Sequence, residues 1–114
     1  MPVVVLVTAG RAEEAERLAQ ALVVEHLAAC VNVVPGVQSV YRWQGEVERA
    51  TEWLLVIKTV QPALPAVIER IKSLHSYTVP EVLALPVSAG SDAYLAWLTG
   101  QVRPQPDPTR PSGA

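Results

Sequence analysis

Residues 37–47 read Val37-Gln38-Ser39-Val40-Tyr41-Arg42-Trp43-Gln44-Gly45-Glu46-Val47 and predict the end of a β-hairpin. Gln44-Gly45 separates two strand-like runs, and glycine in the second loop position suits a tight turn. The outgoing run begins at Ala29 and is interrupted at Pro35-Gly36, and the return run extends to Val60. Fifteen strand residues at about 3.3 Å each reach about 50 Å, whereas a domain of this size is roughly 35 Å across. We therefore expect the hairpin to extend beyond its own domain.

The segments on either side of the hairpin alternate between strand and helix patterns. Residues 3–7 form a continuous apolar run, which is typical of a central strand buried on both faces. Residues 11–27 and 61–74 carry apolar stripes at helical spacing. Residues 82–87 resemble a fourth strand with Pro86 at its end or edge, and Ser91-Asp92 begins a short last helix. The order β-α-β-β-α-β with a C-terminal helix predicts an α+β fold of the ferredoxin-like type, with the helices on one face of a mostly antiparallel sheet.

Composition restricts the class of protein. The chain has 114 residues, of which 50% are apolar and 18% charged, so it can form one packed domain. We place that domain at residues 1–102 and a proline-rich flexible tail at 103–114. A net charge of −2 gives no basic surface for nucleic acid, and no apolar run is long enough to span a membrane. A single cysteine, Cys30, and a start without signal-peptide features favour the cytoplasm.

The part of the hairpin that should overhang is apolar. Its aromatic and aliphatic side chains would promote aggregation through free strand edges unless another chain covered them. Pairing with symmetric copies resolves this, so we expect a homo-oligomer. The alternative is a hairpin that bends at Pro35-Gly36 and folds back on its own sheet.

One resemblance depends on several stretches taken together, which are Val4-Val5-Leu6-Val7-Thr8-Ala9, Leu27-Ala28-Ala29-Cys30-Val31-Asn32-Val33-Val34-Pro35-Gly36, Ser39-Val40-Tyr41-Arg42-Trp43-Gln44-Gly45, Glu52, Ile57-Lys58-Thr59, His75-Ser76-Tyr77-Thr78-Val79-Pro80-Glu81 and Tyr94-Leu95-Ala96-Trp97-Leu98. With these stretches the chain resembles the CutA divalent-cation-tolerance family over about residues 3–102.

The resemblance implies a homotrimer built like PII-type signalling proteins, a role in tolerance to divalent metals, copper especially, and no catalytic activity. Two departures bear on the metal. The family's His-Pro-Tyr pattern is His75-Ser76-Tyr77 here, and the positions linked to copper in some relatives are Val7, Leu74 and His75, so one of three candidate ligands is present.

His75 is the predicted metal residue, because a neutral imidazole binds copper and other borderline metals. The alternative role for His75 is to cap the preceding helix or to make an ordinary hydrogen bond. Lys58, in an apolar strand, needs a charged partner, and Glu81 is the predicted one. With Tyr77, they predict a polar cleft for a small anion or a metal complex, or else an ion pair that fixes the strand register. Tyr41 and Trp43 complete the predicted ligand-binding set.

Other conspicuous residues favour packing. Cys30 sits in an apolar strand and is expected to behave as a small hydrophobic residue. The alternative is a Cys/His pair with His26, but no basic group or helix N-terminus is evident to activate the thiol. Arg11 follows Gly10 in the loop where acylphosphatases bind phosphate, but the glycine-rich cradle is absent. Trp53 and Trp97 are expected in a core or an interface.

We thus expect a cytoplasmic homotrimer that responds to divalent metal ions and binds Cu²⁺ or another divalent cation conditionally. Its partners are its own copies and the metal ion, with no required cofactor and no enzymatic activity. The alternative is a PII-like regulatory module that senses a small molecule in clefts between subunits.

Overall fold

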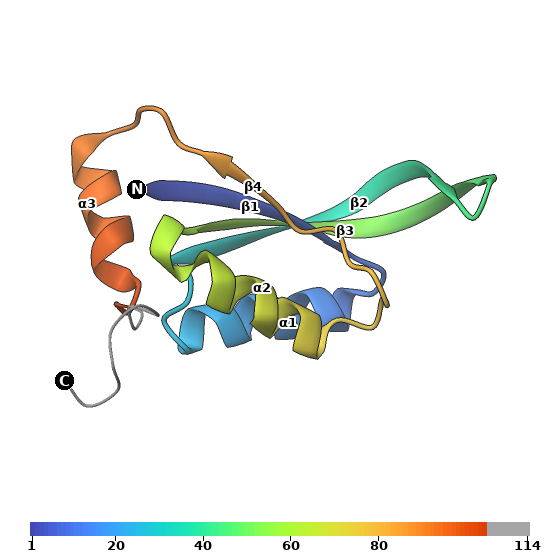
Figure 1. Ribbon diagram of the computed structural model, residues 1–114, viewed down its shortest axis with the longest axis horizontal. Helices are drawn as coiled ribbons and strands as arrows, with labels where there is room; N and C mark the ends of the chain where they lie inside the picture. Colours follow the sequence, from blue (N-terminus) through green and yellow to red (C-terminus); the bar gives the residue numbers. More distant parts are fainter. Residues whose placement is uncertain (105–114) are drawn as a thin grey trace.

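The computed structural model describes residues 1–104 as a four-stranded antiparallel sheet with two long helices on one face and a third helix at one end (Figure 1). The elements in chain order are β1 Pro2–Ala9, α1 Ala12–Val24, β2 Cys30–Trp43, β3 Glu46–Val60, the 3₁₀ turn Gln61–Ala63, α2 Leu64–Leu74, β4 Leu83–Pro86 and α3 Asp92–Gln101. The strand order is β2-β3-β1-β4. The predicted α+β order and its C-terminal helix are confirmed. Of the tail expected at 103–114, residues 105–114 lie outside the described part.

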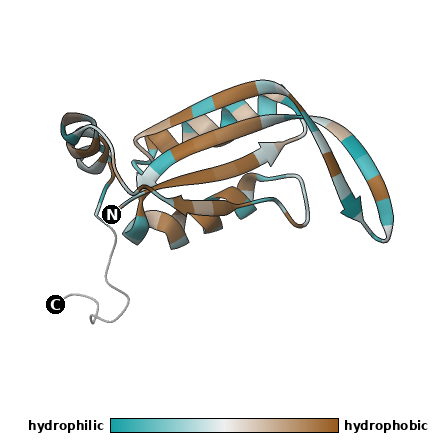
Figure 2. Ribbon diagram, turned by 90° about the horizontal axis from the view of Figure 1, so that it is seen from above, coloured by the Kyte–Doolittle hydropathy of each residue, from teal (hydrophilic) through white to brown (hydrophobic). Residues whose placement is uncertain are grey.

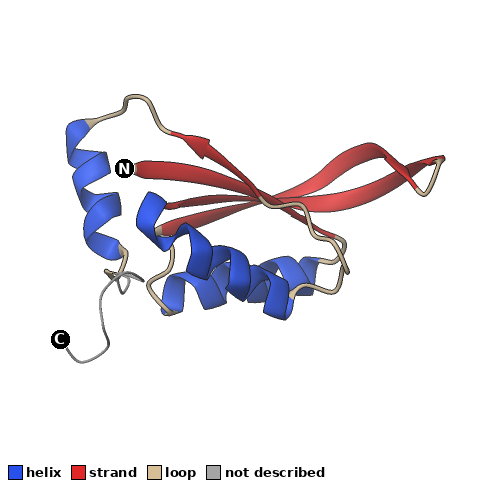
Figure 3. Ribbon diagram, in the orientation of Figure 1, coloured by secondary structure: helices blue, strands red, loops and turns tan. Residues whose placement is uncertain are grey.

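The core lies between the sheet and helices α1 and α2 (Figure 3). Side chains alternate along a strand, so Val3, Val5 and Val7 of β1 face the helices, and each is at most 1% exposed. Ile57 and Leu55 of β3, which pair with Val5 and Val7, are buried as well. The amphipathic stripes of α1 and α2 close this core from the other side.

No helix of the described residues 1–104 covers the opposite face of the sheet. Val4, Leu6, Leu54 and Val56 alternate with the buried positions and are only half-buried. Leu83 and Leu85 of β4 pair with Leu6 and Val4 and are exposed. We call these six apolar residues the open face. The expectation that β1 is buried on both faces is therefore wrong for a single chain, because the helices cover only one side.

The hairpin β2–β3 extends past the rest of the domain. The molecule measures 50 × 34 × 25 Å, and its radius of gyration of 15.3 Å exceeds the value of about 13 Å for a chain of this length. Between Val34 and Val37 the pairing register shifts, with Gly36 at φ 73°, yet both strands continue outward. The hairpin therefore does not fold back at Pro35-Gly36. Figure 2 shows that hydrophobic residues continue into the overhang, where they alternate with hydrophilic ones.

Two predictions for the C-terminal part are confirmed, the position of Pro86 at a strand end and the start of the last helix at Ser91. β4 ends at Pro86 and pairs only with β1, so it is an edge strand. The Ser91 hydroxyl accepts a hydrogen bond from the Tyr94 backbone N–H and caps α3. The Arg103 N–H donates to the His26 carbonyl at 2.8 Å, which fixes the end of α3 beside the end of α1.

Candidate functional site

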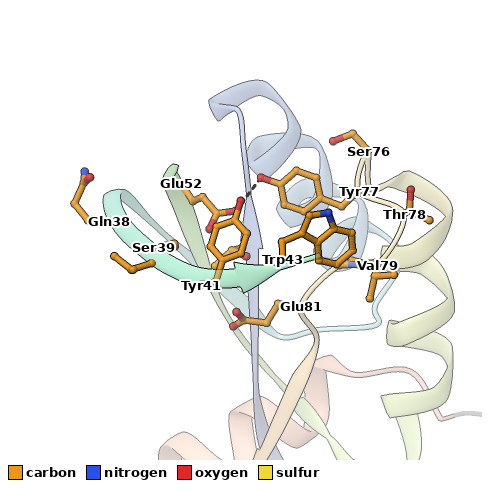
Figure 4. A pocket seen from close by; sticks show the side chains of 13 residues that line it. Gln38, Ser39, Tyr41, Trp43, Glu52, Ser76, Tyr77, Thr78, Val79 and Glu81 are labelled. Carbon is orange, nitrogen blue, oxygen red and sulfur yellow. Dashed lines mark hydrogen bonds between the residues drawn. The ribbon is translucent and has the colours of Figure 1, made fainter. Parts of the chain in front are cut away.

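A groove of about 860 Å³ lies where the hairpin leaves the domain, between the overhang and the connection from α2 to β4. Its volume is in the range of small-molecule sites. Figure 4 shows its polar and aromatic side chains. The lining residues are Thr8, Gln38, Ser39, Val40, Tyr41, Trp43, Glu52, Ser76, Tyr77, Thr78, Val79, Pro80 and Glu81.

One hydrogen bond joins the two walls of the groove. The Tyr77 hydroxyl donates to Glu52 Oε2 at 2.8 Å (Figure 4). Gly10 makes this approach feasible, because a Cβ atom there would lie 2.7 Å from the Tyr77 hydroxyl oxygen. Burial, together with the hydrogen bond to Glu52 and the charge of that carboxylate, raises the pKa of Tyr77 to about 12. Tyr77 is therefore a neutral hydrogen-bond donor at physiological pH.

A second network fixes the start of the connecting segment. Glu14 of α1 accepts hydrogen bonds from the backbone N–H and the hydroxyl of Ser76, both at 2.8 Å. Burial by itself would raise the pKa of Glu14, but these two hydrogen bonds and the charges of His75 and Arg17 outweigh it and keep the pKa below its usual value. The carboxylate is therefore ionised at neutral pH and holds Ser76 beside α1.

His75 belongs to the same network and is buried. Its Nε2–H donates to the Thr8 carbonyl at 2.7 Å, and its Nδ1 accepts from the Tyr77 backbone N–H at 3.0 Å. Nδ1 also lies 3.1 Å from Glu14 Oε1, a contact that attracts when the imidazole is protonated. The ring packs against the Tyr77 ring, with 4.7 Å between centroids. A metal at His75 would have to displace one of these partners.

The groove carries negative charge. Glu52 and Glu81 line it together with the phenols of Tyr41 and Tyr77, and within residues 1–104 its lining includes no lysine, arginine or histidine. Glu52 is only 5% exposed. Its Oε2 accepts from Tyr77, whereas Oε1 has no hydrogen-bond partner among residues 1–104. In residues 1–104, every side-chain nitrogen or oxygen that is fully buried has a hydrogen-bond partner. Since Glu52 Oε1 has none, this oxygen is accessible to solvent.

The predicted pair of Lys58 and Glu81 does not form within the chain. In the sheet, Lys58 lies between Val4 and Cys30. The groove begins four residues away along β3, where Leu54 pairs with the groove residue Thr8. Glu81 lies at the groove instead (Figure 4). The predicted ion pair of Lys58 and Glu81 is wrong for the single chain. A lone lysine in an apolar strand indicates that it needs a charged partner, but not which residue is that partner. The side chain points to the uncovered side of the sheet.

Of the predicted ligand-binding residues, Tyr41, Trp43, Tyr77 and Glu81 all line the groove, and Lys58 does not. The residues missed by the sequence analysis are Glu52, Glu14 and Gly10. Glu52 had a usable signal, since it is a carboxylate at the start of the buried apolar run of β3. The roles of Glu14 and Gly10 depend on contacts 62 or more residues away, which periodicity does not reveal.

The remaining singled-out residues lie elsewhere. Cys30 is a free, half-buried thiol at the start of β2. Arg11 is exposed before α1 and makes no side-chain cap. Trp53 packs against the core, and Trp97 is exposed on α3 beside Tyr94. Within residues 1–104, no group of three or more His, Cys, Asp or Glu side chains is placed to hold a metal ion.

Comparisons with known proteins agree with this architecture. The sequence matches the family of the "CutA1 divalent ion tolerance protein" over residues 3–101. The chain belongs to the CutA1 divalent ion tolerance family. The match covers both walls of the groove as well as the core.

Relatives extend over most of the domain. The divalent-cation tolerance protein CutA of Thermus thermophilus is 55% identical over 98 residues, which cover 86% of this chain and 95% of that protein. The chloroplastic protein CutA of Arabidopsis thaliana is 50% identical over 101 residues, which cover 89% of this chain but 56% of the plant protein. The solved Thermus thermophilus Cut A1 structure superimposes with a TM-score of 0.89 at 52% identity, covering 90% of this chain and all of that one.

Among residues 1–104, no helix is both long and apolar enough to cross a membrane.

Proposed function

We propose that this CutA1-family chain works as a homotrimer in the response to divalent metal ions, as a regulatory module that binds a small molecule in the groove beside Tyr77 and Glu52. The groove supports a binding role, because it combines exposed aromatic rings with the Glu52 carboxylate, which has one hydrogen-bond partner in the described part of the chain. We propose no catalytic activity and a cytoplasmic location, the latter on the free thiol of Cys30.

The overhanging hairpin is the observation that supports assembly. Val40 and Val47 are each at least 57% exposed on it. Both sheet edges, β2 and β4, are unpaired in one chain, and the open face adds further uncovered apolar surface. Exposed edges and apolar surface of this kind drive association. Closed symmetry around these features covers them without leaving a growing edge.

Copper binding through His75 is the second candidate. Its favourable observation is that an imidazole nitrogen and a carboxylate oxygen, His75 Nδ1 and Glu14 Oε1, lie 3.1 Å apart. Nitrogen and oxygen donors suit divalent copper. A metal there would compete with the Tyr77 backbone N–H and with Ser76, so this site requires the connecting segment to move.

Native mass spectrometry with and without Cu²⁺ tests both candidates. We expect a species with the mass of three 12.3 kDa copies, with no Cu²⁺ retained at His75. A Val40→Lys, Val47→Lys double variant should shift the mass toward one copy, and an Ala12→Lys, Glu13→Lys control on the exposed start of α1 should not. A monomeric wild-type protein would refute the trimer. Stoichiometric Cu²⁺ lost in His75→Ala would favour the copper site over the sensing module.

A further inference from the structure

The charge of the groove identifies the class of molecule that fits it. Among the described residues that line it, the titratable side chains are Glu52, Glu81, Tyr41 and Tyr77. Neither carboxylate has a cationic partner among the described residues. A small anion, the ligand suggested by the sequence, would therefore meet two carboxylates and no positive charge.

Glu52 provides the most specific contact. It is only 5% exposed, its Oε2 accepts the hydrogen bond from Tyr77, and its Oε1 has no hydrogen-bond partner among residues 1–104. Placing a carboxylate out of water costs free energy unless a counter-charge or hydrogen bonds compensate it. Tyr77 supplies one neutral donor. A cationic hydrogen-bond donor at Oε1 would complete the set.

The aromatic lining distinguishes an organic cation from a metal ion. Tyr41, Trp43 and Tyr77 surround the groove together with the two carboxylates (Figure 4). Aromatic faces attract ammonium and guanidinium groups and favour the apolar stems that carry them. A divalent metal ion instead needs several fixed oxygen or nitrogen ligands, and no cluster of three acidic, histidine or cysteine side chains occurs in residues 1–104.

We propose that the groove binds a small organic cation bearing a primary ammonium group, which donates to Glu52 Oε1 and packs its alkyl stem against Tyr41 and Trp43. Glu81 supplies a second negative charge at the exposed side. This inference rests on the proposed function of the groove as a ligand site and names the ligand class. The groove volume of about 860 Å³ exceeds that of a single amine, so a diamine also fits.

Titration calorimetry with cadaverine tests the proposal, using 1,5-pentanediol as the neutral analogue and glutarate as the anionic one. We expect cadaverine alone to bind. Glu52→Gln keeps an acceptor for Tyr77 but removes the charge, and it should weaken cadaverine binding about tenfold or more. Trp43→Leu should weaken it about threefold. Glu16→Gln, the same change at an exposed position of α1 outside the groove, should leave binding unchanged.

Equal heats from cadaverine and pentanediol, or unchanged affinity in both Glu52→Gln and the exposed-side variant Glu81→Gln, would overturn the proposal. Cu²⁺ binding that is lost in Glu52→Gln while cadaverine gives no heat would also overturn it and assign the groove to a metal ion. A native mass spectrum of the same sample separates failure of the ligand proposal from failure of the proposed trimer. Three copies without cadaverine binding refute only the ligand class, and a single copy refutes the proposed assembly.

Discussion

The Tyr77 hydroxyl donates to Glu52 Oε2 at 2.8 Å across a gap that a glycine at position 10 keeps open. The two residues are 25 positions apart and come from β3 and from the connection between α2 and β4. The bond therefore couples the base of the hairpin to a segment that no sheet ladder holds. Its loss would release one wall of the groove from the other.

Removing that hydroxyl should destabilise the fold modestly. For Tyr77→Phe we expect the free energy of unfolding to fall by about 1–2 kcal/mol, because a hydrogen bond to a carboxylate is lost and Glu52 keeps no donor. Urea denaturation at fixed protein concentration measures this, since assembly makes stability depend on concentration. Tyr94→Phe, on exposed α3, is the matched control and should change stability little. An equal loss in both variants would contradict the role of the bond.

Gly10→Ala should act through the same contact. Its Cβ would lie 2.7 Å from the Tyr77 hydroxyl oxygen, so the ring has to shift away from Glu52. We expect a loss of about 1–3 kcal/mol, which is the cost of overpacking. Gly100→Ala meets nothing within 4 Å in α3 and should stabilise by up to about 1 kcal/mol.

A double-mutant cycle identifies the cause of the Gly10→Ala effect. In a Tyr77→Phe background the clashing oxygen is absent, so Gly10→Ala should cost clearly less than in the wild type. Additive losses would show that Gly10 acts through its backbone and not through Tyr77.

The phenol of Tyr77 should ionise only at high pH. Its pKa is raised to about 12, so the difference in ultraviolet absorbance between wild type and Tyr77→Phe should have its midpoint near that pH. Because the folded pKa lies above the unfolded value of 10, the stability linked to this group is complete below pH 10 and is lost as the pH rises through the folded pKa. Glu52→Gln should move the midpoint back toward 10. A midpoint that does not move would show that burial alone raises the pKa.

Glu14 should contribute to acid sensitivity. Its folded pKa lies below its unfolded value near 4.5, so its contribution to stability is present above that value and is lost as the pH falls through the lower folded pKa. Replacing it in Glu14→Gln should flatten the decline of thermal stability below about pH 4.5. The exposed Glu16→Gln change is the control and should leave the acid limb as in the wild type. Identical acid limbs in both variants would exclude Glu14 as its source.

The sequence predicted most of the fold because periodicity is local. The apolar stripes of α2, the Gln44-Gly45 turn and the Ser91 cap each depend on neighbours within a few residues. The site was predicted less completely. The aromatic residues of the overhang are predicted by their pattern, whereas the Tyr77–Glu52 hydrogen bond joins residues 25 positions apart, which local patterns do not reveal. The predicted pair of Lys58 and Glu81 does not form within the chain, because a lone charge in an apolar strand indicates that a partner is needed but not which residue provides it.

The turn of the hairpin offers a test in which the two loop residues respond oppositely. Gln44 and Gly45 have φ values of 51° and 82°, the positive values that a type I′ turn requires at both positions. Glutamine adopts this region at a cost that asparagine avoids, so Gln44→Asn should stabilise the protein by up to about 1 kcal/mol. Gly45→Ala should destabilise it by about 1–2 kcal/mol, although nothing lies within 4 Å of the added Cβ, because the strain is in the backbone. Both changes are measured by thermal unfolding at one protein concentration. A neutral Gly45→Ala would mean that the turn relaxes freely and does not determine the hairpin register.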